Sequence, residues 1–324
     1  MRSTIFSIDS DLKFAEAALS VFNFQYQHNA VYRRYVDYIG VNREAISDYR
    51  EIPFLPIELF KSQHIYAAAN EPVQLFSSSG TTGVSTSKHP VADLAWYEDS
   101  FRKAFQHFYG EARDIAILAL LPSYLEREGS SLIFMVDDLI AQSKQPESGY
   151  FLYNHDELQA VLSQLKNKGT KTLLIGVTYA LLDFSEHHQI DFPELIVMET
   201  GGMKGKRKEM VREELHAILC RAFNVPYIHS EYGMTELLSQ AYSAGLGRFK
   251  TPAWMQVLTR DTNDPLTLIN SGNTGAINVI DLANYHSCSF IATQDLGKRY
   301  ADGSFEVLGR FDNSDIRGCN LLVQ

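Results

Sequence analysis

The sequence predicts an α/β protein in which layered, mostly parallel sheets are flanked by helices, with a smaller β-rich subdomain toward the C-terminus. Two observations support this fold class. Between about residues 93 and 236, short apolar runs alternate with segments that have the apolar spacing of amphipathic helices. From about residue 249 onward, short strand-like runs are separated by turn residues.

The first part of the chain contains helices and one short strand. Residues up to about 49 place apolar side chains at mixed i+3 and i+4 spacing, which predicts helix. The apolar run 73–76 predicts a strand. Residues 93–110 then predict an amphipathic helix, with Asp93 as its N-cap and Gly110 as its C-terminal stop.

The central part alternates between strand and helix. Strands are expected within 114–122, 170–177 and 193–202 and at the start of 225–236, and helices within 130–143, 155–169 and 206–224. Strands separated by helices pair in parallel, so this alternation predicts the parallel sheet.

The pattern changes near Phe249, which divides the chain into an α/β part, 1–248, and a β-rich part, 249–324. Within the second part, "ADGS" at 301–304 has the composition of a hairpin turn. We therefore expect short antiparallel strands on either side of it.

Composition excludes several classes of protein. The formal net charge of −10 is opposite to what binding of nucleic acid or of an anionic membrane surface requires. Apolar runs such as 115–121 are too short to span a bilayer, and the N-terminus has no secretory pattern. Three cysteines at spacings without a zinc motif indicate a reducing compartment, so a cytoplasmic location is expected.

One stretch has the chemistry of an anion site. "SSSGTTG", residues 77–83, follows the predicted strand 73–76 and precedes Lys88. Amides of a glycine-rich turn and adjacent hydroxyls together bind phosphate, and Gly80 and Gly83 allow close approach of a ligand. The spacing fits neither a Walker A loop nor a dinucleotide fingerprint. A solvated surface linker is the alternative interpretation.

Four segments, in the same order, resemble the motifs of the adenylate-forming superfamily, which includes acyl-CoA synthetases. They are "SSSGTTG" with "SK" at 87–88, "YGMTE" at 232–236, "TQDLGKRYADGSFEVLGR" at 293–310 and "GRFDNSDIRG" at 309–318. The resemblance implies the large-domain fold of that superfamily and an enzyme that binds ATP and Mg²⁺ and forms an acyl adenylate.

The resemblance also implies roles for individual residues. Tyr232 would stack on adenine within the motif that includes Gly233, Thr235 would bind the α-phosphate, and Glu236 would hold Mg²⁺, which prefers carboxylate and phosphate oxygens. The expected ligands of the β- and γ-phosphates are Ser78, Ser79, Gly80, Thr81, Thr82 and Gly83, with Lys88. Taken alone, each has a plainer alternative: Tyr232 is more commonly a buried loop aromatic, and Glu236 more commonly a solvated charge. For Lys88, the alternative is a solvated surface lysine.

Two further parts of the nucleotide site follow from the same resemblance. Gly201 and Gly202 end an apolar run and resemble the adenine-binding turn, although a plain strand-to-helix turn is the alternative. Asp295 would accept hydrogen bonds from the ribose hydroxyls, although Gln294 stands where the superfamily usually has glycine. Arg310 would reach the ribose or a phosphate, and its alternative is a salt bridge at a hairpin end.

Over almost its whole length, the chain resembles one branch of the superfamily, the acyl-protein synthetases of bacterial luminescence operons (the LuxE type). "IPFLPIELFK" at 52–61, "GGMKGKR" at 201–207 and "IRGCNL" at 316–321 carry this resemblance. It implies that the mobile C-terminal lid domain is absent, that a fatty acid is activated, and that the acyl group passes to Cys319 and then to a partner such as an acyl reductase or acyltransferase. An incidental tail cysteine is the alternative for Cys319.

Two other functions stay open. A ligase that makes acyl- or aryl-CoA, similar to phenylacetate-CoA ligases, would need the same adenylation site. A nucleotide-binding subunit without catalysis would dock on a partner enzyme. Dependence on coenzyme A separates the first of these from the acyl-protein synthetase.

Overall fold

The computed structural model describes residues 1–78, 86–122, 129–201 and 210–310. Two compact units form. One contains residues 3–69 and the chain from 253 onward, and the other contains Arg2 and residues 70–252. The sequence-based division at 248/249 instead groups residues 3–69 with the central part. Within the described residues, no helix is long and apolar enough to cross a membrane.

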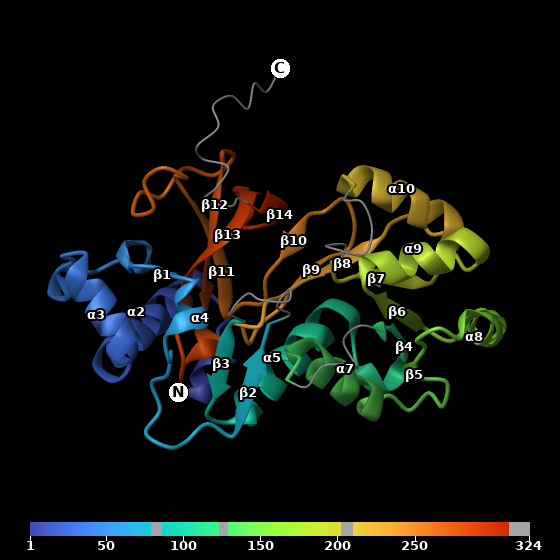
Figure 1. The fold of residues 1–324 in the computed structure, drawn as a ribbon, viewed down its shortest axis with the longest axis horizontal. Coiled ribbons are helices and arrows are strands. Elements are labelled where there is room, and N and C mark those ends of the chain that lie inside the picture. The colour runs from blue at the N-terminus through green and yellow to red at the C-terminus, as the bar shows by residue number, and fades with distance from the viewer. Residues whose placement is uncertain (79–85, 123–128, 202–209, 311–324) are drawn as a thin grey trace. The chain divides into compact units, whose positions relative to one another are not determined.

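The unit of residues 3–69 and 253–310 is built around an antiparallel sheet (Figure 1). Its strands run in the order β11, β12, β13, β14, and the short β1 pairs in parallel with β13. The strands are β1 Leu55–Pro56, β11 Met255–Arg260, β12 Thr274–Asp281, β13 Phe290–Arg299 and β14 Phe305–Arg310. The helices are α1 Arg2–Ile5, α2 Asp11–His28, α3 Ala30–Tyr38 and α4 Leu59–Ser62, with short 3-10 turns Arg43–Ala45, Tyr49–Glu51 and Leu282–Asn284. The "ADGS" turn joins β13 to β14, as the sequence predicts.

A buried amide fixes α2 to this sheet. The Gln25 side chain donates to the carbonyls of Asn284 (2.8 Å) and Tyr285 (3.0 Å), and its oxygen accepts the Ser289 amide at 2.9 Å. Close by, Phe22, Tyr32 and Phe290 are almost fully buried and pack ring against ring. The N-terminal helices therefore belong to the same core as strands more than 250 residues away, because buried amides must be paired.

The unit of residues 70–252 contains the predicted parallel sheet. Strands β5, β4, β6, β7 and β8 pair in parallel in that order, and β9 and β10 extend the sheet in antiparallel fashion. Their bounds are β4 Ala116–Leu120, β5 Gly149–Tyr150, β6 Thr172–Gly176, β7 Ile196–Glu199, β8 His229–Tyr232, β9 Ala241–Ser243 and β10 Phe249–Lys250. A separate antiparallel hairpin is formed by β2 Gln74–Ser77 and β3 Lys88–Val91.

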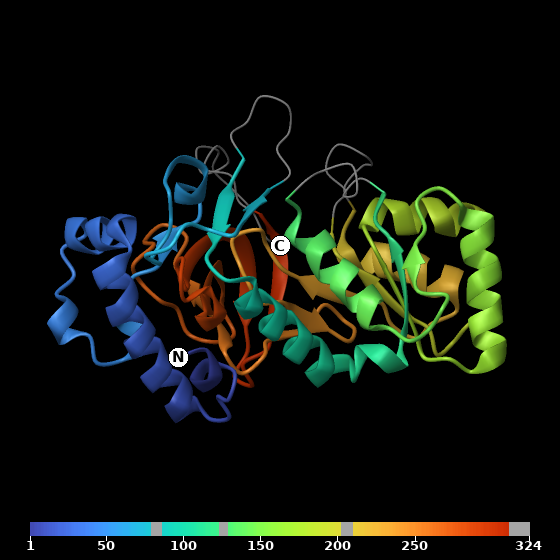
Figure 2. The same ribbon diagram turned by 90° about the horizontal axis from the view of Figure 1, so that it is seen from below.

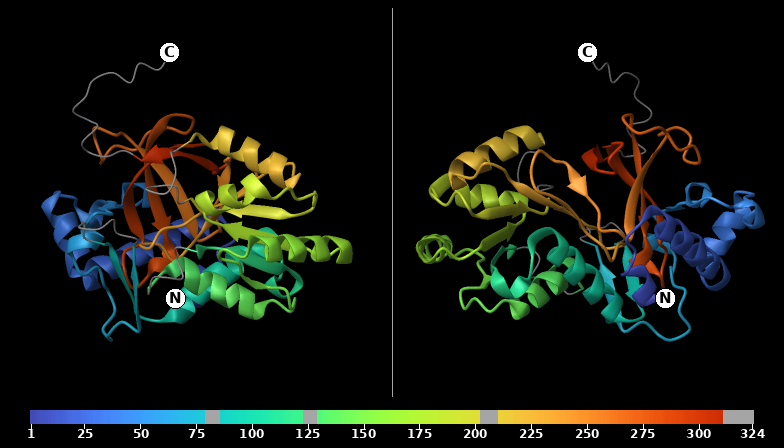
Figure 3. Two further views of the ribbon diagram at one scale, coloured as in Figure 1. Left: turned by 45° about the vertical axis from the view of Figure 1, so that its right-hand side comes forward. Right: turned by 180° about the vertical axis from the view of Figure 1, so that it is seen from behind.

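Helices cover both faces of this parallel sheet. Helices α9 Thr178–His187 and α10 Arg212–Phe223 lie side by side on one face, and α5 Leu94–Tyr109 and α7 Ser131–Gln142 lie on the other (Figures 1 and 3). Helix α8 His155–Lys168 lies at the outer edge of the unit (Figure 2), and a 3-10 turn, Ala112–Asp114, precedes β4. The fold class predicted from the sequence is thus confirmed, since buried apolar strands need helices on both faces.

Local signals in the sequence set the ends of these helices. The Asp93 side chain accepts the Ala95 amide at 2.9 Å, and Gly110 follows α5 with φ +91°. Both predicted ends of that helix are therefore confirmed, because an N-cap needs a short polar side chain and positive φ favours glycine.

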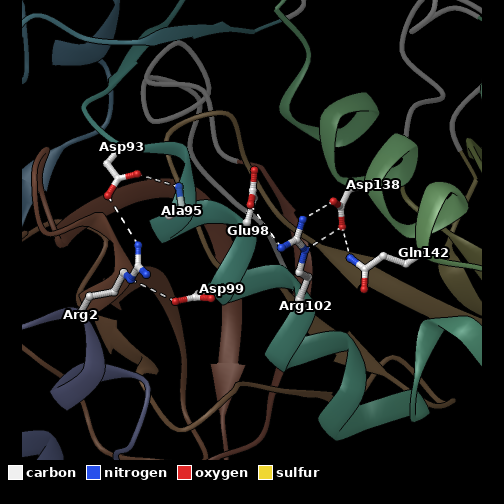
Figure 4. A network of polar contacts seen from close by, with 8 residues as sticks. All are labelled: Arg2, Asp93, Ala95, Glu98, Asp99, Arg102, Asp138 and Gln142. Carbon is white, nitrogen blue, oxygen red and sulfur yellow. Dashed lines mark hydrogen bonds and ion pairs between the residues drawn. The ribbon is translucent and has the colours of Figure 1, made fainter.

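Ion pairs on the outer surface of α5 connect it to its neighbours (Figure 4). Arg102 binds the Asp138 carboxylate of α7 with two nitrogens and also pairs with Glu98 at 3.2 Å. Arg2 pairs with Asp99 at 3.1 Å and with Asp93 at 3.6 Å. These contacts are partly exposed, so each contributes little to stability.

Candidate adenylation site

The β2–β3 hairpin holds both ends of the hydroxyl-glycine loop. The Ser78 amide donates to the Ser87 carbonyl at 3.1 Å, and the Ser78 hydroxyl oxygen accepts the Ser87 amide at 2.9 Å. Ser78 therefore stabilises the base of the loop, while its hydroxyl proton can still be donated. Lys88 begins β3 and is exposed. Ser79, Gly80, Thr81, Thr82 and Gly83 lie outside the described residues.

A buried histidine joins this hairpin to the "YGMTE" segment. His89, in β3, is 1% exposed, and its Nδ1 lies 2.8 Å from the Thr235 carbonyl oxygen. Burial lowers the pKa of His89 to about 4, so the ring is neutral at pH 7. Because a carbonyl only accepts, Nδ1 carries the proton. This hydrogen bond thus joins the strand that follows the hydroxyl-glycine loop to the "YGMTE" segment, through two residues that are 146 positions apart.

Residues 232–236 follow directly from β8. Tyr232 ends that strand, is 8% exposed, and packs its ring against Phe249 at 5.9 Å. Glu236 is buried, and Gly233 and Thr235 are half-buried. A buried loop aromatic is the alternative that the sequence leaves open for Tyr232, and its packing fits that alternative.

A second buried acid shapes the turn after β7. One oxygen of Glu199 accepts the Gly201 amide at 2.8 Å and the Thr178 hydroxyl at 3.2 Å. The Gly201 carbonyl accepts the Thr178 amide at 2.9 Å, and Gly201 has φ +75°. Gly201 is therefore held at both its amide and its carbonyl, in a backbone conformation that favours glycine. Gly202 lies outside the described residues.

Glu199 is ionised despite its burial. Burial alone would raise its pKa, but the neighbouring His216 and Ser230 side chains, the hydrogen bond from the Gly201 amide and the charge of Arg212 lower it. His216 Nε2 lies 3.8 Å from the carboxylate. The carboxylate thus connects α10, β8 and the Gly201 turn.

The neighbouring acid on β8 behaves in the opposite way. Burial, and then the negative charge of Glu199, raise the pKa of Glu231 to about 8. His229 lies on the same strand, and burial lowers its pKa to about 4. Its Nδ1 lies 3.3 Å from the Tyr109 hydroxyl. These side chains form a partly buried polar cluster beside the "YGMTE" segment.

The predicted ribose ligands lie in the unit of residues 3–69 and 253–310. Asp295 and Arg310 are paired across β13 and β14, and Arg310 Nε lies 3.3 Å from an Asp295 oxygen. Asp295 is buried, whereas the Arg310 side chain is 67% exposed. The hairpin-end salt bridge is therefore present, and the pair presents both an acceptor and a donor near the end of β14. Cys319 lies outside the described residues.

Acidic and other metal-binding side chains are distributed across the described part of the chain. Across residues 1–78, 86–122, 129–201 and 210–310, no group of three or more His, Cys, Asp or Glu side chains has metal-binding geometry. In general, Mg²⁺ bound with a nucleotide takes one or two carboxylates from the protein and its other ligands from phosphate oxygens and water. Glu236, adjacent to the Thr235 carbonyl that His89 fixes, would supply such a carboxylate.

Sequence reasoning missed His89, Glu199 and Glu231 as members of this site. Glu199 stands at the end of an apolar run, a signal that the sequence does contain. Nothing around His89 in the sequence indicates its contact with Thr235.

Neither family models nor curated proteins match this chain. Solved structures do. A 2-hydroxyisobutyryl-CoA ligase in complex with 2-HIB-AMP and CoA is 13% identical with a TM-score of 0.67, covering 95% of this chain and 70% of the ligase chain. MatB from Rhodopseudomonas palustris with bound ATP is 16% identical with a TM-score of 0.53, covering 73% of this chain and 47% of its own. The chain therefore has the fold of adenylate-forming acid–CoA ligases.

Proposed function

We propose that this chain activates a carboxylic acid with ATP, forming an acyl adenylate and pyrophosphate, and then transfers the acyl group to a thiol. The observation that carries the proposal is the hydrogen bond between His89 and the Thr235 carbonyl. It connects the strand that follows the hydroxyl-glycine loop to the segment with the expected α-phosphate and magnesium ligands. A phosphate loop and an acidic metal ligand must be neighbours for this chemistry, because one nucleotide contacts both.

The proposed roles follow the resemblance of each motif to the adenylate-forming superfamily. The loop of residues 78–83, with Lys88, would hold the β- and γ-phosphates, and Thr235 would donate to the α-phosphate. The Gly201–Gly202 turn and Tyr232 would bind adenine beside Gly233, and Asp295 with Arg310 would bind the ribose. Glu236 would hold Mg²⁺, whose positive charge stabilises the negative charge that develops on the phosphates.

For the second step, we propose that the thiol is Cys319 of this chain and that the acid is a fatty acid. Attack of the thiolate on the acyl carbon would form the thioester and release AMP, and the acyl group would pass to a partner such as an acyl reductase or acyltransferase. The resemblance of the chain to acyl-protein synthetases supports this version. Transfer to coenzyme A is the second candidate, because the complex of 2-hydroxyisobutyryl-CoA ligase contains CoA.

The experiment for the thiol acceptor uses radiolabelled octanoate or myristate, ATP and magnesium, without coenzyme A. We expect label on the denatured wild-type chain that neutral hydroxylamine removes, and none on Cys319→Ser. Cys220→Ser is the matched control, since Cys220 is a half-buried thiol on α10. Release of acyl-CoA after addition of coenzyme A, with no label on any variant, would instead support the second candidate.

A further inference from the structure

Two adjacent parallel strands of the central unit place acidic side chains at neighbouring positions. Glu199 ends β7 and is opposite Ser230 in the register, so Glu231 is the next residue of β8. Glu199 accepts hydrogen bonds from the Gly201 amide and the Thr178 hydroxyl. Within the described part of the chain, no hydrogen bond or ion pair engages the Glu231 carboxyl. One of the two acids is thus committed to the fold, and the other has its polar atoms available.

The Glu231 carboxyl lies against the "YGMTE" segment. A Cβ atom added to Gly233 would overlap Glu231 Oε1. The glycine therefore leaves room for the carboxyl directly beside the backbone that leads to Thr235 and Glu236. Glu231 itself is half-buried, so the carboxyl is not sealed from a ligand.

Uncharged groups surround this carboxyl on the face of the sheet that α5 covers. Tyr242 of β9 is directly opposite Glu231 in the antiparallel register, and His229 projects to the same side two residues earlier on β8. Tyr109, at the end of α5, packs edge-on to Tyr242 at 5.3 Å and contacts His229. Burial, and then the neighbouring Glu231, raise the pKa of both tyrosines, and burial lowers the pKa of His229, which keeps its ring neutral. The only charged group that acts on Glu231 from the neighbouring β7 is Glu199, among the described residues.

We propose that Glu231 is a ligand-binding residue whose neutral carboxyl donates a hydrogen bond to an anionic oxygen of the ligand held beside residues 232–236. The inference rests on the proposed function, which brings two anions, a carboxylate and a triphosphate, to this segment. An ionised glutamate there would repel both, whereas a carboxylic acid donates to either. Burial, and then the negative charge of Glu199, raise the pKa of Glu231 and so favour its neutral form.

The proposal predicts proton uptake on binding. With a pKa of about 8, about half of the Glu231 carboxyls are ionised at pH 8 in the free protein. An anion that accepts a hydrogen bond from the carboxyl raises the pKa of Glu231 further. Binding at pH 8 is therefore accompanied by the uptake of at most about half a proton per protein molecule. At pH 6 the carboxyl is already protonated, and uptake through it disappears.

The test is isothermal titration calorimetry at pH 8 in two buffers of different ionisation enthalpy. The probes are magnesium–ATP without acid and octanoate without ATP, so that the reaction does not start. We expect the wild type to take up at most about half a proton when it binds one of the two probes. Uptake with magnesium–ATP identifies the anion as a phosphate, and uptake with octanoate identifies it as a carboxylate. Glu231→Gln, which keeps a donor without a titratable proton, should bind within about threefold of wild type and take up none. Glu231→Met, which has no donor, should bind about tenfold more weakly.

The outcomes separate this inference from the function on which it rests. Nucleotide binding with no uptake from either probe, or with the same uptake in Glu231→Gln as in wild type, overturns the inference alone. No nucleotide binding by the wild type at any pH overturns both. Glu194→Gln, an exposed acid before β7, is the matched control and should behave as wild type. Thermal unfolding of each variant establishes that a loss of binding is not a loss of fold.

Discussion

Replacing Glu231 by glutamine should change how the stability of the protein depends on pH. The folded state raises the pKa of this carboxyl from 4.5 to about 8, chiefly through burial and then through Glu199. Between those values the folded chain keeps a proton that the unfolded chain releases. The free energy of unfolding therefore falls as pH rises from 4.5 to 8, because the folded state binds more protons.

The size of the effect follows from the shift. At about 1.4 kcal/mol per pH unit, a rise from 4.5 to about 8 corresponds to a loss of up to about 5 kcal/mol at pH 8. Glutamine has nearly the shape of a protonated glutamate and does not titrate. Glu231→Gln should thus match wild type near pH 4.5 and exceed it progressively toward pH 8.

The assay is urea unfolding of both proteins at pH 5, 6, 7 and 8, and the quantity compared is the difference between their free energies of unfolding. Taking the difference cancels the titrating groups that do not interact with Glu231. Equal free energies for the two proteins across this range would refute the reasoning, since they would mean that Glu231 titrates alike in the folded and unfolded chains.

Three further changes test other parts of the structure. His89→Gln should reduce the stability that the protein loses on acidification. The pKa of His89 is about 4 in the folded chain and about 6.5 in the unfolded chain, so the wild type loses up to about 3 kcal/mol of unfolding free energy as pH falls from 6.5 toward 4. Urea unfolding of both proteins at pH 4.5 and 7 measures this loss, and the same loss in the variant would contradict the prediction. Glu199→Ala should lower the free energy of unfolding by about 2 kcal/mol, because the Gly201 amide and the Thr178 hydroxyl lose their acceptor. The same change should raise the KM for ATP more than it lowers kcat. A variant with the KM of wild type would show that the Gly201 turn does not contact nucleotide. Gly297→Ala should lower the free energy of unfolding by roughly 2 kcal/mol or more, because the added Cβ would overlap the Glu306 carbonyl and lie 2.5 Å from Ile277 Cδ1. Gly303→Ala meets nothing within 4 Å and should cost only about 1 kcal/mol, for its positive φ. Equal melting temperatures of the two variants would contradict this packing argument.

Local patterns in the sequence predict the central unit well. The helix of residues 94–109 is bounded by Asp93 and Gly110, and each acts within a few residues of its own position. The alternation of apolar runs and amphipathic segments is likewise enough to predict parallel pairing of β4, β6 and β7. Such signals are short in range, so they are visible in a single sequence.

Long-range contacts are where prediction from the sequence fails. The contact of Gln25 with Ser289 spans 264 residues, and nothing near either residue indicates the other. This is why the N-terminal helices could not be assigned to the core that contains β12 and β13.

The candidate site shows the same limit. The motif residues Ser78, Gly201 and Tyr232 could be selected from their neighbours in the sequence. His89 and Glu231 could not, because their roles depend on burial and on strands that come together only in the fold. A protonated glutamate in particular has no sequence signature, since its pKa is set by the environment.

The central claim, that this chain forms an acyl adenylate, is tested most directly by acid-dependent exchange of labelled pyrophosphate into ATP. The account predicts exchange with magnesium and a carboxylic acid across a panel of chain lengths, and a loss of at least about a hundredfold in Glu236→Gln and Thr235→Val, which remove the proposed metal and α-phosphate ligands. Exposed Glu213→Gln should exchange as wild type. Absence of exchange with every acid, in a folded protein that binds magnesium–ATP, would contradict the account and favour a nucleotide-binding subunit without catalysis.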